Sequence, residues 1–482
     1  MSFDTQFFPL NITVLRVTIC TQSKRSRSAL GHPTMASEIE LTRLPSQRKE
    51  STTEQQLDYD REHEVDESAT HYALPPVDGG RRAWAFLAGA TVVEMLVWGF
   101  PYSIGILHAY WSNTLFKGYG ESAITLASTL QTGLLYVSCA IFGPVFTRWP
   151  RWQKPLQYIA LFISALSMIG SAFATKPWHL VITNGCIYPF AGALYLPCCT
   201  ILFEWFVAKR GIATGLMYAG TGVGGVAYPY IMSGLLNGVG YKAALVSMGV
   251  GYAILGSIAL IPVSRRVPLS RYHFAEPGRR KQINFSFLKN SVALTGSLII
   301  LFVSMGNFIP TVWLPSYADD LKLRHLDGTA LIAILNAATI PGNILLGYFS
   351  DYSIRAAIVV SCVGSAFGCA FLWGLGTNTA MLVAFAIVYG FLGSSFQCLW
   401  SNMIGVISKD DPIAPSLIFS IFALMRAIGN ITSGPVSGAL MKHDSFPGAV
   451  GAYGFHNYGA LLVYTAVTIF TGGVTGILFK DR

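Results

Sequence analysis

The chain has 482 residues, of which 52% are hydrophobic and only 12% are charged, and its formal net charge is +9 at pH 7. Soluble domains carry about 25% charged residues, so this composition indicates that lipid surrounds most of the chain. The positive charge does not indicate nucleic-acid binding, because the Lys and Arg residues are spread over many loops rather than gathered in one patch.

Residues 1–82 form a polar segment rich in Ser, Thr, Glu, Gln and Arg, with too little apolar content to fold alone. We expect a disordered cytosolic tail here. Its mildly apolar part, residues 5–20, contains Arg16 and lacks a basic lead, which argues against a signal peptide. Met35 offers an alternative start of translation, and recovery of peptides from residues 2–34 would exclude it.

Twelve apolar stretches follow, each about 20 residues or longer, the length at which a helix crosses a bilayer. The sequence therefore predicts an all-α membrane protein with twelve transmembrane helices. The stretches lie near 83–107, 122–146, 155–174, 178–207, 211–236, 241–263, 292–316, 328–350, 356–376, 380–406, 413–440 and 457–478.

A basic stretch at 264–291 separates the first six spans from the last six. We expect a cytosolic linker here between two six-helix halves, 83–263 and 292–478, with a short tail at 479–482. Parallel repeats of this kind are a known transporter plan, with the substrate site between the halves.

A short pattern occurs once in each half. Gly143, Thr147 and Arg151 follow the second span, and Gly347, Asp351 and Arg355 follow the eighth with the same spacing. The match at equivalent positions indicates a duplicated six-helix unit.

The distribution of basic residues sets the orientation, because cytosolic loops carry an excess of Lys and Arg. With the N-terminus in the cytosol, the outward loops hold only six of the 33 Lys and Arg residues. We therefore expect both termini to be cytosolic.

Two groups of charges at the predicted cytosolic ends of spans suggest gating contacts. Glu204 lies beside Lys209 and Arg210 after the fourth span, and Asp351 lies near Arg355 after the eighth. We interpret both groups, together with Arg151, as ion pairs that latch one closed state, although exposed pairs contribute little individually.

Several motifs resemble the major facilitator superfamily, and specifically the fungal branch of its monocarboxylate porter family. Residues 78–84 (DGGRRAW) resemble that family's acidic-Gly-Gly start of the first span, and residues 204–215 (EWFVAKRGIATG) resemble its signature before the fifth span. The glycine-rich run 219–225 and two segments of the seventh and eighth spans, LPSYA at 314–318 and ILNAA at 334–338, continue the resemblance, which covers about 78–478.

The resemblance implies a transporter, but two positions depart from it. Family members commonly carry, directly after a glycine in the eighth span, an arginine that holds the substrate carboxylate; here the dipeptide is Gly342-Asn343. Thr147 also stands where the superfamily usually has Asp.

Apart from Lys242, which stands at the outward end of the sixth span and is counted with the loops, Arg426 is the only Lys or Arg inside a predicted span; it lies about 20 Å from the cytosolic end of the eleventh. Glu94 lies at a similar depth in the first span, about 17 Å from that end. Charges inside a membrane are costly and usually functional, so we expect both residues to serve substrate binding or coupling. They could also pair with each other in one conformation, or Arg426 could cap backbone carbonyls and Glu94 bind a neighbouring hydroxyl.

Uncharged polar side chains and aromatic rings complete the candidate site. The polar candidates are Asn307, Asn336, Asn343 and Gln397. The aromatic candidates are Trp98, Tyr102, Tyr195 and Trp400, which would fit a substrate bulkier and flatter than lactate. Packing is the alternative role for each. Six glycines of the fifth span, between residues 211 and 225, predict close helix approach there.

These observations predict a secondary transporter that works by alternating access on a small organic solute, most simply an organic anion such as a monocarboxylate. Export of a fungal secondary metabolite is the alternative, and a non-transporting membrane sensor is a minor one. We expect no enzyme activity, cofactor or metal site, because the spans contain no nucleophile–base or metal-ligand constellation. We expect a monomer in the plasma membrane, with an internal membrane such as the vacuole as the alternative, and protons as a possible coupling ion.

Overall fold

The computed structural model describes residues 74–117, 119–268, 290–322, 328–409, 414–442 and 446–480. Every regular element within these ranges is a helix. The α-helices are α2 (Arg81–Tyr102), α3 (Ile104–Tyr110), α4 (Glu121–Arg148), α5 (Gln153–Ser171), α6 (Pro177–Leu180), α7 (Ala191–Trp205), α8 (Arg210–Val239), α9 (Tyr241–Leu260), α11 (Ser291–Asn307), α12 (Ile309–Asp320), α13 (Gly328–Tyr352), α14 (Ile354–Phe367), α15 (Thr379–Leu392), α16 (Trp400–Ser408), α17 (Ala414–Leu440) and α18 (Tyr458–Ile477).

Short π- and 3₁₀-helical segments interrupt or extend several of these helices. They are η1 (Trp111–Leu115), η2 (Pro150–Trp152), η3 (Val181–Ile187), η4 (Tyr188–Phe190), η6 (Gly368–Trp373), η7 (Ser394–Leu399) and η8 (Gly451–Gly454). Single-turn π-helical bulges inside α-helices are frequent at functional sites, whereas 3₁₀ turns are common at helix ends.

Within the described residues, ten helical segments are long and apolar enough to cross a membrane. They coincide with ten of the twelve predicted spans. The remaining two predictions, near 155–174 and 211–236, fall on α5 and α8, which are helical but are not among those ten. The count of twelve and the orientation of the termini therefore stay predictions.

The predicted tail up to residue 73, with Met35, and residues 269–289 of the predicted linker lie outside the described residues. The adjoining residues contact the helices. The backbone N–H of Asp78 donates to the Trp205 carbonyl over 2.9 Å, and Arg266 Nε donates to the Pro75 carbonyl over 2.7 Å. These contacts lie on the N-terminal side of the predicted boundary at residue 82.

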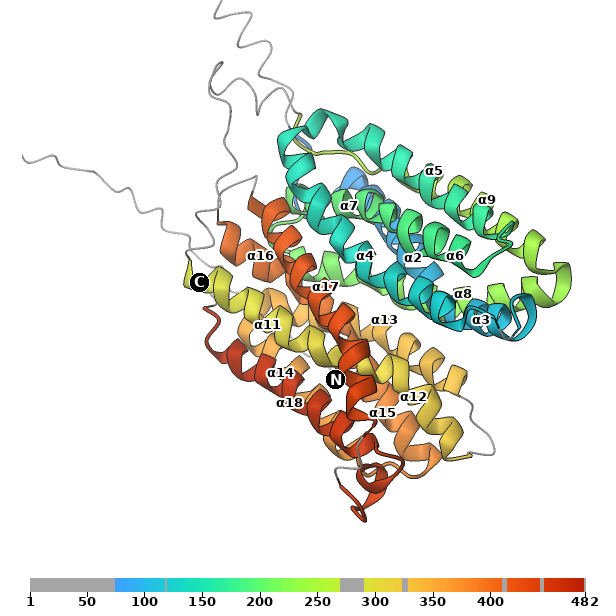
Figure 1. The fold of residues 1–482 in the computed structure, drawn as a ribbon. Coiled ribbons are helices and arrows are strands. Elements are labelled where there is room, and N and C mark those ends of the chain that lie inside the picture. Colours follow the sequence, from blue (N-terminus) through green and yellow to red (C-terminus); the bar gives the residue numbers. More distant parts are fainter. Residues whose placement is uncertain are drawn as a thin grey trace, which may run out of the picture. The chain divides into compact units, whose positions relative to one another are not determined.

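Helices α2–α9 gather in one bundle and helices α11–α18 in a second, drawn in blue to green and in yellow to red in Figure 1. The bundles meet along two pairs of helices. In one pair α8 packs along α13, and in the other α4 packs along α17. We call these the α8–α13 seam and the α4–α17 seam.

Glycines allow α8 to lie against two neighbours at once. A Cβ atom added at Gly215 would lie 2.3 Å from the Asn343 carbonyl oxygen of α13. One added at Gly220 would lie 2.5 Å from the Thr91 carbonyl oxygen of α2. The predicted close approach of helices at these glycines is confirmed.

The two glycines of the repeated pattern lie one on each seam. A Cβ atom at Gly347 would lie 2.3 Å from the Gly211 carbonyl oxygen of α8. The Gly143 carbonyl accepts a hydrogen bond from Ser416 Oγ of α17 over 3.2 Å. Ser420 Oγ lies 3.4 Å from the Cys139 carbonyl oxygen and shares its proton with the Ser416 carbonyl of its own helix, at 2.9 Å. The pattern therefore marks equivalent places in the two bundles, where each meets the other.

Candidate functional site between the bundles

Arg426 of α17 is buried, with 7% of its surface exposed. Its Nη1 lies 3.5 Å from Ser304 Oγ of α11, and its Cζ lies 5.9 Å from the centre of the Tyr136 ring of α4. Its Nε has no hydrogen-bond partner in the described part of the chain. A cation–π contact and one long hydrogen bond satisfy a buried guanidinium only in part.

Glu94 of α2 is also buried, with 1% of its surface exposed. Its Oε1 accepts a hydrogen bond of 2.6 Å from Thr221 Oγ1 of α8, while Oε2 has no partner among the described residues. Glu94 and Arg426, both described, form no ion pair with each other in this conformation. Glu94 thus takes the predicted hydroxyl contact, and its second oxygen remains available.

An aromatic cluster adjoins Arg426 and contains rings from both bundles. Trp98 lies 4.7 Å from the Tyr136 ring and 5.7 Å from the Tyr195 ring, measured between centres. Phe419 lies 6.0 Å from Tyr195 and 5.6 Å from Trp400. Three of the four predicted aromatic residues, Trp98, Tyr195 and Trp400, belong to this cluster. Tyr136 and Phe419 belong to it as well and were not predicted.

Gln397 of η7 bridges the bundles beside this cluster. Its Oε1 accepts a hydrogen bond of 3.2 Å from the Tyr136 hydroxyl, and its Nε2 donates to the Tyr195 hydroxyl over 3.5 Å. Tyr195 in turn lies 2.7 Å, oxygen to oxygen, from the Tyr218 hydroxyl. Of the four uncharged polar candidates, Gln397 is the one whose amide meets the aromatic cluster.

The three candidate asparagines donate to backbone carbonyls instead. Asn307 Nδ2 donates to Gly393 over 2.8 Å. Asn336 Nδ2 donates to Gly225 over 3.2 Å, and Asn343 Nδ2 donates to Tyr218 over 3.1 Å. Asn336 and Asn343 thereby tie α13 to α8, which supports a packing role for these Nδ2 groups, whereas Asn343 Oδ1 has no partner among the described residues.

Asn430, one turn beyond Arg426 on α17, was missed by the sequence reasoning. It is buried with 7% of its surface exposed, and neither its Oδ1 nor its Nδ2 has a partner among the described residues. Its spacing of four residues from Arg426 was the available signal, because residues i and i+4 share a helix face. Tyr136 left no comparable signal, since its contact with Arg426 depends on how α4 packs on α17.

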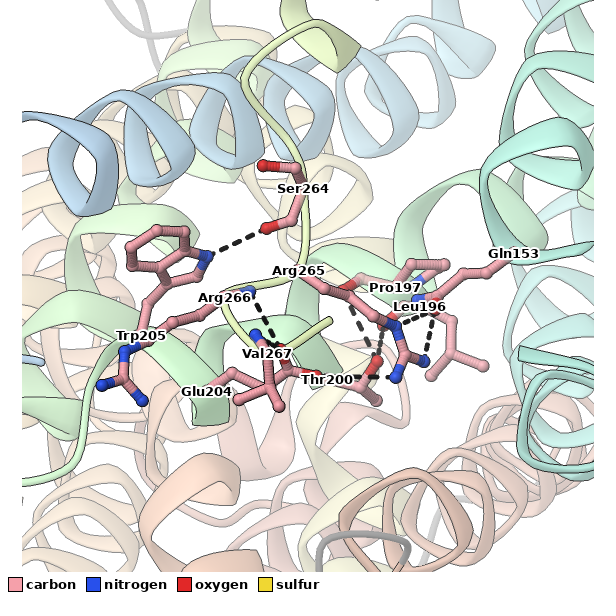
Figure 2. A network of polar contacts seen from close by, with 10 residues as sticks. All are labelled: Gln153, Leu196, Pro197, Thr200, Glu204, Trp205, Ser264, Arg265, Arg266 and Val267. Carbon is pink, nitrogen blue, oxygen red and sulfur yellow. Dashed lines mark hydrogen bonds and ion pairs between the residues drawn. The ribbon is translucent and has the colours of Figure 1, made fainter. Parts of the chain in front are cut away.

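The predicted gating charge Glu204 pairs with a different arginine. Its Oε1 lies 3.6 Å from Arg265 Nη1, and its Oε2 accepts the backbone N–H groups of Arg266 and Val267 over 3.0 and 3.2 Å. Arg265 also donates to Gln153 Oε1 over 2.9 and 2.6 Å. Figure 2 shows this network, which joins the end of α7 to the segment after α9. In this conformation the ion-pair partner of Glu204 is thus Arg265 rather than Lys209 or Arg210, and the gating role of these residues stays a prediction.

Asp351, at the end of α13, binds the first turn of α8. Its carboxylate accepts the backbone N–H groups of Gly211 and Ile212 over 2.6 and 3.0 Å, and Asn402 Nδ2 over 3.0 Å. A helix start favours negative charge, so this contact stabilises the α8–α13 seam. The predicted partner Arg355 donates its Nε to the Phe479 carbonyl over 2.8 Å.

Asp78 holds the three residues before α8. Its carboxylate accepts backbone N–H groups from Val207, Ala208 and Lys209 over 2.8, 3.1 and 2.9 Å. Partial burial acts to raise the pKa of Asp78, but the three backbone donors and the Lys209 charge outweigh it and hold the pKa below its usual value. The Arg210 guanidinium covers the Phe203 ring at 4.6 Å. Arg151 lies exposed in η2.

A multi-pass helical membrane protein with a buried cation between two bundles has the make-up of a membrane transporter. The sequence profile of the Major Facilitator Superfamily matches residues 87–434. The chain belongs to this superfamily.

Relatives from fungi cover most of the chain. The chain is 26% identical over 379 residues to the MFS-type transporter pynF of Aspergillus niger, covering 78% of this chain and 85% of the relative. It is 26% identical to the fujikurins efflux protein of Gibberella fujikuroi, with 83% and 86% covered, and 25% identical to the aspyridones efflux protein apdF of Emericella nidulans, with 86% and 82% covered.

The crystal structure of the nucleoside transporter NupG shares the fold, with a TM-score of 0.55 and 17% identity over 82% of this chain and all of that one. The superfamily and the named relatives are transporters rather than enzymes. The expected superfamily is thus confirmed, whereas the narrower monocarboxylate resemblance has no counterpart in the relatives' names, two of which are efflux proteins.

Proposed function

We propose that the protein is a secondary active exporter, which moves a small organic secondary metabolite across the membrane by alternating access. The observation that carries the proposal is the partly satisfied Arg426 next to an aromatic cluster built from both bundles. A site built from both bundles changes its geometry when the bundles rearrange, so binding of a solute there shifts the conformational equilibrium. The names of the fungal relatives support export as the direction.

The architecture that goes with this function has twelve spans in two halves, 83–263 and 292–478. The linker 264–291 and the tails 1–82 and 479–482 are cytosolic. Helices α5 and α8 are the third and fifth spans; their 19 and 30 residues correspond to about 28 and 45 Å of helix, enough to cross the hydrocarbon core at a tilt. We place the protein in the plasma membrane as a monomer.

Glu94 is the group that we assign to proton coupling. It is buried, lies on α2 against α8, has one oxygen without a partner among the described residues, and forms no ion pair with any of them. Taking up a proton from one side and releasing it to the other would drive export. A protonophore should therefore abolish export, and Glu94→Gln should abolish the response to an imposed pH gradient.

Uptake of a monocarboxylate is the second candidate, and Arg426 alone favours it. The position that holds the carboxylate in the monocarboxylate family is Asn343 here, and its amide donates to a backbone carbonyl of α8. This contact leaves export as the better-supported function.

Deletion of the gene in the source organism tests the direction. Metabolites in cells and in medium would be compared by mass spectrometry in the parent, the deletion strain and the deletion strain carrying the intact gene. Export predicts at least one organic compound that rises inside the deleted cells and falls in the medium, with reversal on complementation. Unchanged metabolite distribution together with reduced uptake of labelled carboxylates would contradict it.

A further inference from the structure

The polar face of α17 holds buried groups that the protein itself does not satisfy. Arg426 Nε and both amide atoms of Asn430 have no partner among the described residues, and each side chain is 7% exposed. Buried polar groups are almost always hydrogen-bonded, because an unsatisfied one costs free energy. Two such side chains one turn apart, on the same helix face, indicate a place for a ligand.

The chemistry of these two side chains defines the ligand's polar end. A guanidinium is a pure donor with a fixed positive charge, and an amide adds an N–H donor and a carbonyl acceptor. The other buried charge, Glu94, makes no ion pair with Arg426 and hydrogen-bonds Thr221. An ionised oxygen is therefore the group that would satisfy Arg426, through a charge-assisted hydrogen bond.

The neighbouring rings define the ligand's shape. Tyr136 lies under the guanidinium at 5.9 Å and in contact with Trp98 at 4.7 Å between ring centres. Gln397 connects Tyr136 to Tyr195 by hydrogen bonds of 3.2 and 3.5 Å, which are long for such contacts. Because these contacts are weak, a flat ligand would displace this planar amide at little cost.

We propose that the substrate is a planar, conjugated organic anion, whose ionised oxygen binds Arg426 Nε and the Asn430 amide while its ring lies against Tyr136 and Trp98. This inference rests on the proposed function and narrows its substrate class. The inference requires that both the charge and the flat ring of the ligand contribute to affinity.

Equilibrium binding of tritiated 2-naphthoate to the purified full chain in detergent tests both contributions, that of the charge and that of the flat ring. The competitors are 2-naphthamide, which keeps the ring and loses the charge, and decalin-2-carboxylate, which keeps the charge and loses planarity. We expect 2-naphthoate to bind about 10-fold more tightly than either competitor.

Variants assign each preference to its residue. Arg426→Gln should remove the preference for 2-naphthoate over the amide, and Tyr136→Leu should remove the preference over the decalin acid. Tyr136→Phe should keep the latter, because the ring remains. Arg148→Gln, at the exposed end of α4, is the matched control and should bind as the intact protein does.

Equal affinity for 2-naphthoate and 2-naphthamide in the intact protein would overturn the inference, as would an Arg426→Gln variant that weakens both equally. If Arg426→Gln does not elute as a folded protein, Asn430→Leu decides the question. On the inference, Asn430→Leu weakens the binding of 2-naphthoate more than the binding of 2-naphthamide. An intact protein that exports a neutral metabolite but shows no preference for the acid would overturn this inference and leave the proposed function standing.

Discussion

The two seams that join the bundles are held by different kinds of contact. On the α8–α13 seam, Gly215 lies directly against backbone, and Asp351 and Asn343 hydrogen-bond the backbone of α8. On the α4–α17 seam, Ser416 Oγ donates to the Gly143 carbonyl, and Arg426 Nε and both amide atoms of Asn430 have no partner among the described residues. On the α8–α13 seam, one such atom, Asn343 Oδ1, also lacks a described partner. The α8–α13 seam is therefore closely packed, whereas the α4–α17 seam contains polar groups that are free to bind a solute.

One substitution at equivalent positions accounts for part of the difference. Asp351 reaches across to the start of α8, whereas Thr147, at the matching place in the first half, donates its hydroxyl to the Gly143 carbonyl of its own helix over 2.9 Å. Because the Thr147 hydroxyl donates within its own helix, it forms no hydrogen bond across the α4–α17 seam. The α4–α17 seam is therefore the one we expect to separate more readily during transport.

Replacing a glycine by alanine on each seam should give the largest difference in the free energy of unfolding. Gly215→Ala would place a Cβ 2.3 Å from backbone, which cannot move alone, so we expect a loss of about 1–3 kcal/mol in the free energy of unfolding. Gly133→Ala on α4 meets the flexible Ile431 side chain at 2.8 Å and should cost clearly less. Thermal unfolding of both variants in one detergent measures the contrast. Equal losses would remove the distinction between the seams.

Removing the charge that joins α13 to α8 should give the next largest effect. Asp351→Asn keeps the shape but weakens two hydrogen bonds to the helix start, and we expect a loss of about 1–2 kcal/mol. Thermal unfolding in low salt checks it. Unchanged stability would show that the carboxylate charge is unimportant to the α8–α13 seam.

The reverse change should strengthen the other seam. Thr147→Asp puts a carboxylate one turn beyond Gly143, toward the start of α17, where we expect a gain of about 0.3–1 kcal/mol and slower export. Thr147→Asn, without the charge, is the control. A faster exporter with unchanged stability would contradict the view that this seam opens.

The smallest effect concerns pH and the segment before α8. Because the folded pKa of Asp78 is lowered, its stabilising contribution is present above the unfolded value of about 3.9 and is lost as the pH falls through the folded pKa. The contribution is small, since the carboxylate is partly open to water. Below pH 4, the melting temperature should fall less steeply with pH for Asp78→Asn than for the intact protein. Equal slopes for the two proteins would contradict this prediction.

Ten of the twelve expected spans and the burial of two charges could be predicted from the sequence, because bilayer thickness fixes span length and a lone charge is conspicuous in an apolar stretch. Arg426 and Glu94 are indeed buried. Partners could not be predicted. Glu204 binds Arg265, which lies 61 positions away, instead of the nearby Lys209, and Tyr136 reaches Arg426 only because α4 packs on α17. Such contacts depend on the packing of helices distant in sequence, which composition and spacing do not encode.

Arg426→Gln and Asn343→Ala, measured side by side for thermal stability and for export per folded molecule, test most directly whether Arg426 binds substrate. We predict that Arg426→Gln abolishes export of a planar organic anion without lowering the melting temperature, because the described residues satisfy the guanidinium only in part. Asn343→Ala should lower the melting temperature while the folded molecules still export. Full export by Arg426→Gln, with a reduced melting temperature, would contradict the account and assign Arg426 to packing.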